Sequence, residues 1–259
     1  MIYEYFVANF QLFLIIFARL IGMFIAAPFY SGTAMPARMR LGFGFFTTLL
    51  VSPLVMASGV SVPANLVDFG ARLLGNFVFG AGIGFFAYLI ITAFQMSAQI
   101  FSIPMGLGMN EVVDPLSDTQ VPALGNILGI MVLFLLLQVD GHFYFVRVIV
   151  ESFQRVETLS ASSFGTLTQG LTMGLSVMFD TSMKIALPII AITLLLDMAM
   201  GMIARVAPQF NIMIMGFNIK ILAGFLIVFL ALPPLLDLGH ALIDGIITSA
   251  RELAYYMKG

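Results

Sequence analysis

Six long runs of apolar residues recur along the chain, separated mostly by short polar connections. Each run is long enough, or nearly so, to cross a hydrocarbon layer of about 30 Å. The pattern therefore predicts an all-α protein built from membrane-type helical hairpins. The runs lie near residues 10–27, 41–57, 73–94, 124–139, 185–203 and 212–236.

Three further stretches complete the pattern. A shorter apolar run at 142–150 either extends the fourth segment or turns back in the membrane interface. The connections at 95–123 and 152–174 are longer than the others. Because the stretch at 152–174 is rich in serine and threonine, it is typical of a polar linker. It divides the chain into an N-terminal part and a C-terminal helical hairpin.

Composition supports a membrane protein. Apolar residues make up 61% of the chain and charged residues only 9%, whereas a soluble domain carries about 25% charged residues. The net charge of −2 provides no basic field, so we expect no nucleic acid partner. The N-terminal Met-Ile-Tyr-Glu-Tyr-Phe has no basic stretch, and we do not expect it to be a cleavable signal.

The same composition bears on metals and cofactors. The chain has no cysteine, which excludes disulfides and thiolate metal sites. Its two histidines, His142 and His240, are far apart in sequence, which disfavours a histidine metal site. We therefore expect no metal and no cofactor.

Four charged residues, Arg19, Lys184, Asp197 and Lys220, fall inside the apolar segments or at their edges. A charge at the bilayer centre costs roughly 2.5–3.5 kcal/mol on insertion scales. For Arg19 and Lys184, snorkelling to a helix end and burial in protein both stay open. Asp197 and Lys220 lie deeper, and we expect them to pair inside protein. The basic residues of the connections favour neither side of a membrane, so they give no orientation.

Glycines recur at the GxxxG spacing in two of the segments and in the connection at 152–174. This spacing lets helix backbones approach closely, so the chain is expected to pack densely against helices of its own or of partners. The pairs are Gly80 with Gly84, Gly125 with Gly129, and Gly170 with Gly174.

No catalytic motif stands out. HExxH and GxSxG are absent, and the run Gly80-x-Gly82-x-Gly84 lies within an apolar helix instead of after a strand. No pair of carboxylates sits at helical spacing within a span, as a proton relay would need. We expect no catalytic residues, and so not an enzyme.

The most informative connection is the stretch at 102–122. Pro104 and Pro122 are expected to stop the helices on either side, and Gly106 and Gly108 allow backbone conformations closed to other residues. Met105, Leu107, Met109, Val112 and Val113 give the stretch an apolar character. Non-helical backbone at membrane depth is tolerated only where it is buried in protein or lines a cavity. The stretch is therefore either a re-entrant loop, filter or plug, or an interfacial loop with no gating role.

Four stretches, in order and spanning most of the chain, together resemble one known family. They are the Ala27-Pro-Phe to Pro36-Ala-Arg-Met-Arg-Leu-Gly region, the loop residues Gly106, Val113, Asp114 and Pro115, the Asp140-Gly-His-Phe element, and Ala186-Leu-Pro followed by residues 204–217. The pattern is similar to that of the FliR/SctT family of export-apparatus components in flagellar and virulence type III secretion.

The resemblance implies an architecture and a set of partners. A FliP-like part at 1–165 would be fused to a FliQ-like hairpin and tail at 166–259. Such a subunit would assemble with FliP and FliQ homologues into a gate for unfolded export substrates, with FlhB and FlhA homologues joining it. The expected place is the bacterial inner membrane, within the flagellar basal body.

The resemblance also implies roles for particular residues. The loop at about 95–123 would plug the closed pore. Its candidate plug residues are Pro104, Met105, Gly106, Gly108, Met109, Val112, Val113, Asp114 and Pro115. Candidates for subunit contacts or buried charges are Arg38, Arg40, Asp197, Arg205, Pro208, Gln209 and Lys220. For Arg38, Arg40 and the turn near 205–209, ordinary turn chemistry is the alternative.

Three other functions stay open. An ion-coupled secondary transporter would use Asp197 and Lys220 as coupling residues, although the chain shows no convincing internal symmetry. An intramembrane protease is disfavoured by the absent motifs. The equivalent gate subunit of a virulence injectisome is the third, but Asp140-Gly-His and Pro208-Gln209 favour flagellar service.

Overall fold

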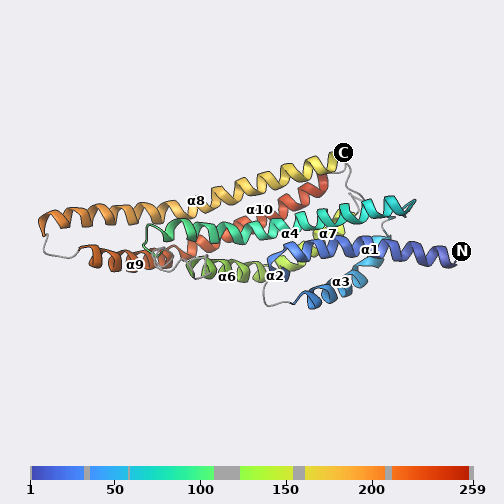
Figure 1. The fold of residues 1–259 in the computed structure, drawn as a ribbon, viewed down its shortest axis with the longest axis horizontal. Helices are drawn as coiled ribbons and strands as arrows, with labels where there is room; N and C mark the ends of the chain where they lie inside the picture. The colour runs from blue at the N-terminus through green and yellow to red at the C-terminus, as the bar shows by residue number, and fades with distance from the viewer. Residues whose placement is uncertain are drawn as a thin grey trace. The chain divides into compact units, whose positions relative to one another are not determined.

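A computed structural model describes residues 2–31, 36–57, 59–107, 123–153, 161–207 and 212–256. Within these ranges the chain forms helices joined by turns and contains no strand, so the all-α prediction is confirmed. The helices are α1 (Ile2–Ala26), α2 (Pro28–Ser31), α3 (Ala37–Ala57), α4 (Leu66–Ser102), α6 (Ala123–Gln138), α7 (Gly141–Phe153), α8 (Ala161–Val206), α9 (Ile212–Leu230) and α10 (Leu232–Tyr256) (Figure 1).

Within the described residues, four helices are long and apolar enough to cross a membrane. They contribute the stretches Asn9–Ala26, Ala37–Ala57, Leu66–Ser102 and Leu167–Val206. Two bent pairs, α6 with α7 and α9 with α10, raise the number to as many as six if each pair counts as one span. The six predicted apolar segments therefore correspond to helices, but their predicted bounds are wrong in several places.

Two helices are much longer than predicted. Helix α4 has 37 residues and α8 has 46, which at 1.5 Å per residue gives lengths of about 55 and 69 Å. The predicted connection at 95–123 is helical as far as Ser102. Likewise, the predicted linker at 152–174 is helical from Ala161 onward. From Ala161 onward, the serines and threonines of this stretch lie on α8, where hydroxyls such as that of Thr172 bond to a carbonyl of the preceding turn.

Two predicted segments are bent. The sixth, at 212–236, breaks at Ala231, where α9 and α10 meet at 53°. Pro233 and Pro234 lack the N–H groups that would continue the helix, which accounts for the break. The run at 142–150 forms α7, which turns by 64° from α6. It therefore does not extend the fourth segment in a straight line.

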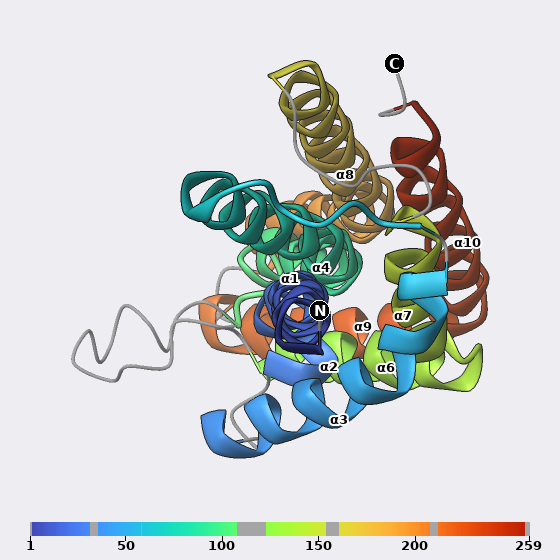
Figure 2. The same cartoon turned by 90° about the vertical axis from the view of Figure 1, so that its right-hand side faces the viewer.

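The chain forms two compact units, and helices α4, α6, α8 and α10 contribute residues to both. The first unit comprises Met1–Ile90, Leu136–Ser176 and Leu242–Gly259. In it α1 packs against α2, α3 and α7, and α1 lies between α3 and α4 (Figure 2). The boundary predicted near 165 concerns a likeness to other proteins, and it stays a prediction.

Glycines set the close approach of α1 and α4 within this unit. A Cβ atom on Gly84 would lie 2.5 Å from the Met23 carbonyl oxygen, and one on Gly80 would meet the Arg19 carbonyl. Gly22, on α1, lies in the same way against the Phe77 carbonyl. The backbones are therefore in contact at the predicted Gly80/Gly84 pair, as this spacing allows.

The second unit comprises Ile91–Leu135 and Val177–Ala241. The last part of α4 contacts three helices here. The Ser182 hydroxyl on α8 donates a 2.9 Å hydrogen bond to the Ala93 carbonyl. Gly129 on α6 lies against the Gln95 side chain, and Gly239 on α10 lies near the Phe94 ring. Helix α9 runs beside the second half of α8 (Figure 1).

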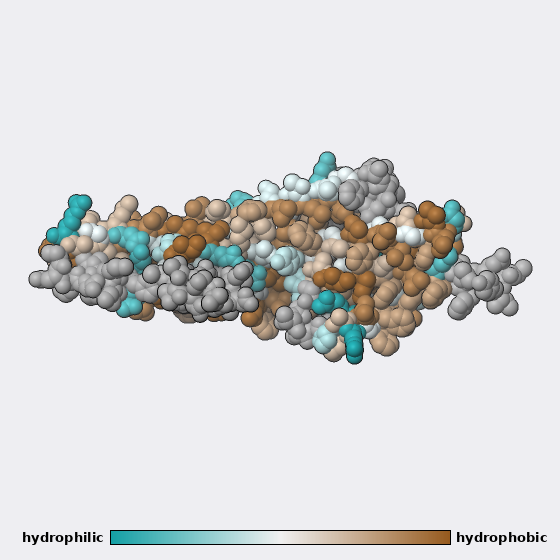
Figure 3. All heavy atoms as spheres, in the orientation of Figure 1, coloured by the Kyte–Doolittle hydropathy of each residue, from teal (hydrophilic) through white to brown (hydrophobic). Residues whose placement is uncertain are grey.

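Large apolar side chains are exposed on several helices. Only 28% of the apolar stretch of α3 and 22% of that of α8 is buried, against 67% for α4. Figure 3 shows hydrophobic atoms over much of the visible surface, with polar groups in smaller patches. Such surfaces need lipid or partner proteins to cover them.

Candidate functional site

Helix α4 ends in a glycine turn at the start of the predicted loop. Gly106 has a left-handed backbone, with φ of 85°. Its N–H donates to the Ile103 carbonyl at 2.9 Å, and the Leu107 N–H donates to the Ser102 carbonyl at 3.0 Å. This pair of bonds defines the Schellman motif, in which glycine closes a helix. The predictions that α4 stops near Pro104 and that Gly106 uses its conformational freedom are confirmed.

Met105, inside this turn, is fully buried. A Cβ atom added to Gly224 of α9 would lie 2.8 Å from both Cγ and Sδ of Met105. The Met105 side chain therefore occupies the space that the missing side chain of Gly224 leaves on α9. The first residues of the candidate plug are thereby fixed to a helix of the C-terminal part of the chain.

The inward face of α9 repeats every fourth residue. Gly216, Gly224 and Val228 are buried along it, and Lys220 is partly buried. Gly216 also faces a methionine, since a Cβ there would lie 2.9 Å from Sδ of Met200 on α8. The face thus carries two glycine notches, each filled by an unbranched, adaptable methionine.

Asp197 of α8 and Lys220 of α9 form an ion pair between these notches. The side chains are 40% and 22% exposed, respectively. The two residues pair within one chain, and their expected place in a protein assembly stays a prediction. Lys184 instead pairs with Asp180 on the same helix at 2.6 Å, with both side chains largely exposed.

The Asp140-Gly141-His142 element forms the bend between α6 and α7. Asp140 has φ of 55°, a left-handed conformation that aspartate and asparagine tolerate better than most residues. Its carbonyl accepts the first N–H bond of α7, from Phe143, at 3.0 Å. A Cβ on Gly141 would lie 2.8 Å from the Leu136 carbonyl oxygen, so glycine is needed there. The bend explains why Asp140 and Gly141 stand between two apolar helices.

Tyr30 connects this bend to the start of α3. Its hydroxyl donates to the His142 carbonyl at 3.5 Å, and its own carbonyl accepts a 2.8 Å bond from Nε of Arg40. Burial raises the pKa of Tyr30 to about 12. Within this chain Arg40 therefore holds a turn together, and its expected role in subunit contacts stays a prediction. Arg38 and Arg205 are exposed on α3 and α8.

Arg19 lies inside the first unit and is only 1% exposed. Its Nε donates to Oδ1 of Asn76 at 2.7 Å, and its Nη1 donates to Oγ of Ser152 at 2.8 Å. The guanidinium also stacks 3.7 Å from the ring centroid of Phe153, a cation–π contact. The snorkelling alternative is therefore wrong for Arg19: its hydrogen bonds lie within the protein, between α1, α4 and α7.

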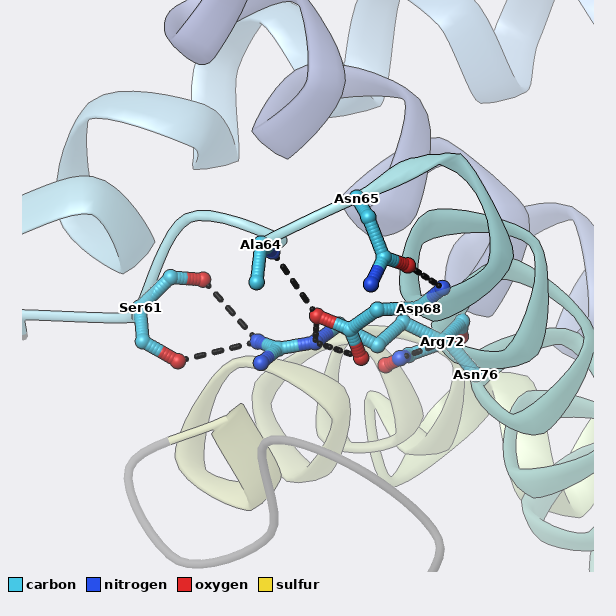
Figure 4. Close-up of polar contacts among 6 residues, drawn as sticks. All are labelled: Ser61, Ala64, Asn65, Asp68, Arg72 and Asn76. Carbon is cyan, nitrogen blue, oxygen red and sulfur yellow. Dashed lines mark hydrogen bonds and ion pairs between the residues drawn. The ribbon is translucent and has the colours of Figure 1, made fainter.

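Asn76 continues into a polar cluster at the start of α4, shown in Figure 4. The Asn76 amide donates to the Arg72 carbonyl at 2.7 Å, and Nε of Arg72 lies 3.0 Å from Oδ1 of Asp68. Nη1 of Arg72 also donates to the carbonyl and to the hydroxyl of Ser61. Asn65 accepts the Asp68 N–H at 2.8 Å and so caps the helix. Sequence reasoning missed this cluster, although Asn65 followed by Asp68 and then an apolar run is a helix-start signal.

Eight residues of the predicted site lie outside the described ranges: Gly108, Met109, Val112, Val113, Asp114, Pro115, Pro208 and Gln209. Among the residues that are described, no group of three or more histidine, aspartate or glutamate side chains is arranged to hold a metal ion.

The described helices define a class: all-α proteins with several membrane-type helices, two of them far longer than one bilayer crossing. The chain belongs to the family described as bacterial export proteins, family 1, whose model matches residues 10–246.

Several relatives carry the name flagellar biosynthetic protein FliR. The protein from Bacillus subtilis is 29% identical over 223 residues, covering 84% of each chain. The Escherichia coli protein is 29% identical over 215 residues, covering 80% of this chain and 78% of its own. The Pectobacterium carotovorum protein is 27% identical over 217 residues, covering 84% and 82%. Family and relatives together support a component of the flagellar export apparatus.

Proposed function

We propose that this chain is a structural and gating subunit of the flagellar protein export gate. It assembles with FliP and FliQ homologues into a pore for unfolded export substrates, and FlhB and FlhA homologues join the complex. Its place is the bacterial inner membrane, within the flagellar basal body. The role is structural, and the energy for export comes from partner proteins.

The observation that carries the proposal is the length and the exposed surface of α8, in a chain that belongs to this family. The helix is about 69 Å long, more than twice the thickness of a hydrocarbon core, and only 22% of its apolar stretch is buried. It also carries Asp180, Lys184, Asp197 and Arg205, three of which are exposed. Charges on such a helix are costly against lipid. Partner helices, which can offer polar groups as well as apolar contact, suit this surface better.

Within this assembly, we propose that the loop following α4 is the plug of the closed pore. The support is its start, where α4 ends in the Gly106 turn and Met105 is buried against Gly224. The candidate plug residues further along are apolar or small, apart from Asp114. An apolar, methionine-containing segment can exclude ions and still yield to a passing chain.

Deletion of residues 105–117 tests the gating role. The assembled complex, reconstituted into a planar bilayer, is expected to conduct small ions, whereas the unaltered complex stays closed. Co-purification of FliP and FliQ homologues with the deletion variant controls for assembly. Conductance equal to that of the unaltered complex, in an intact assembly, would remove the plug from the account.

The transporter alternative keeps one supporting observation, the two bent helix pairs, because discontinuous helices are common at transporter substrate sites. In that function Asp197 would have to bind a coupling ion. In the structure it is paired with Lys220, which competes with a cation. Ion-dependent substrate uptake by vesicles that contain the purified chain alone would favour the transporter.

A further inference from the structure

The first residue of the candidate plug that lies inside the protein is Met105. It sits in the closing turn of α4, between Pro104 and the left-handed Gly106. Proline has a fixed φ and the Schellman turn has fixed hydrogen bonds. These restraints set the direction in which the backbone leaves α4. The Met105 side chain lies against Gly224 of α9.

The fit between Met105 and Gly224 is tight. A Cβ on residue 224 would lie 2.8 Å from Cγ and Sδ of Met105 and closer still to its Cε. Carbon atoms pack at roughly 3.5–4.0 Å, so any side chain at 224 must displace the methionine. Because Cγ and Sδ are both affected, rotation of the terminal methyl alone cannot relieve the contact.

We propose that Met105 is a positioning residue for the plug, and that the Gly224 notch on α9 is its socket. This proposal rests on the proposed gating function. With Met105 seated, the end of α4, from which the candidate plug begins, is fixed to α9. With the socket filled, the start of the loop is released from α9 and the closed state loses its tightness to ions.

The Gly216 notch supplies a matched control. It lies two helical repeats before Gly224 on the same face of α9, and it also holds a methionine, Met200. Met200 belongs to the C-terminal end of α8 and not to the candidate plug. Filling either notch displaces a methionine, by Cε and Sδ at Gly216 and by Cγ as well at Gly224, but only Gly224 lies against the end of α4.

The contact is tested first by cross-linking in the assembled complex. The chain contains no cysteine, so the double variant Met105→Cys/Gly224→Cys carries the only thiols of this subunit. A Cβ at 224 lies 2.8 Å from Met105 Cγ, one bond from the Met105 Cβ, which is compatible with a disulfide. We expect a disulfide on mild oxidation, detected by peptide mass spectrometry. A complex that contains both thiols and forms no such bond would overturn the contact.

The role is tested by ion conductance in planar bilayers. Gly224→Leu is expected to raise conductance towards that of a deletion of residues 108–117, which retains Met105. The conductance of the Gly216→Leu complex should stay near that of the unaltered complex. Met105→Ala in the Gly224→Leu background should restore tightness, since the new leucine fills the space of the methionine. If Gly224→Leu does not assemble, Gly224→Ala replaces it.

Two outcomes separate this inference from the proposed function. If the 108–117 deletion conducts while Gly224→Leu and Gly224→Ala stay as tight as the Gly216 variants, the positioning role is wrong and the plug stands. If the deletion itself conducts nothing, the plug proposal fails and the role of Met105 fails with it.

Discussion

The Nε atom of Arg19 donates a 2.7 Å hydrogen bond to Oδ1 of Asn76, joining α1 to α4 in the interior of the first unit. Asn76 in turn donates to the carbonyl of Arg72, which is paired with Asp68 at the start of α4. A series of polar contacts thus extends from the cap of α4 to the buried guanidinium of Arg19. Arg19 therefore tethers the N-terminal helices to one another, and its loss should affect stability first.

Arg19→Met should lower the stability of the complex. The variant leaves the acceptors on Asn76 and Ser152 without their guanidinium donor, and a hydrogen bond to a charged group contributes about 1.5–3 kcal/mol. Arg19→Lys should recover only part of the loss, because an ammonium does not reproduce the planar fork. Arg147→Met is the control, since Arg147 is exposed and pairs with Glu151 on its own helix. Equal thermal denaturation midpoints for Arg19→Met and Arg147→Met would contradict the role of Arg19.

Gly80→Ala and Gly70→Ala should have opposite effects, although both lie in α4. A Cβ on Gly80 would lie 2.7 Å from the Arg19 carbonyl carbon, a backbone atom that cannot move alone, and overpacking costs about 1–3 kcal/mol. Nothing lies within 4 Å of a Cβ on Gly70, where alanine gains about 0.5–1 kcal/mol of helix propensity. Thermal unfolding of both variants measures the difference. A stabilising Gly80→Ala would mean that α1 and α4 are further apart than described.

Asp140→Asn and Asp140→Gly should be tolerated, whereas Asp140→Val should destabilise the protein. The reason is the φ of 55° at this position, which costs an L-residue without a compensating side chain about 1–2 kcal/mol. Gln138→Val, at an exposed position in the last turn of α6, controls for hydrophobicity. If Asp140→Val and Gln138→Val unfold at the same temperature, the left-handed bend does not determine the sequence here.

Some of this structure follows from sequence alone. The helical class, the stop of α4 at Pro104 and the use of Gly106 depend on local rules, and they were predicted. The burial of Arg19 was left open, because its partners Asn76 and Ser152 are 57 and 133 residues away in sequence. The length of α8 was missed because a stretch rich in serine and threonine is typical of a linker. A helix accommodates these residues when their hydroxyls bond to a carbonyl of the preceding turn. The Met105 socket needs the three-dimensional position of Gly224, for which the chain offers no local signal.

The double swap Asp197→Lys/Lys220→Asp should retain more function than either single neutralisation, Asp197→Asn or Lys220→Met. Removing one partner leaves the other charge partly buried and unpaired, whereas the swap keeps a pair. The Asp180–Lys184 pair is the control, because exposed pairs at i and i+4 contribute only about 0.3–0.5 kcal/mol. Swarming of complemented cells and the yield of complex are measured for the single and double variants of both ion pairs. Additive effects at Asp197 and Lys220, like those of the control pair, would show that their pairing does not contribute to function.

The central claim is that this chain works only as part of a gate with FliP and FliQ homologues. The most direct measurement is native mass spectrometry of the chain co-expressed with both homologues and purified through a tag on this chain alone. The account predicts one particle that contains this chain together with several copies of the partners, and an unstable or mis-assembled product when the chain is expressed alone. A homogeneous, stable monomer that copurifies with neither homologue would contradict it.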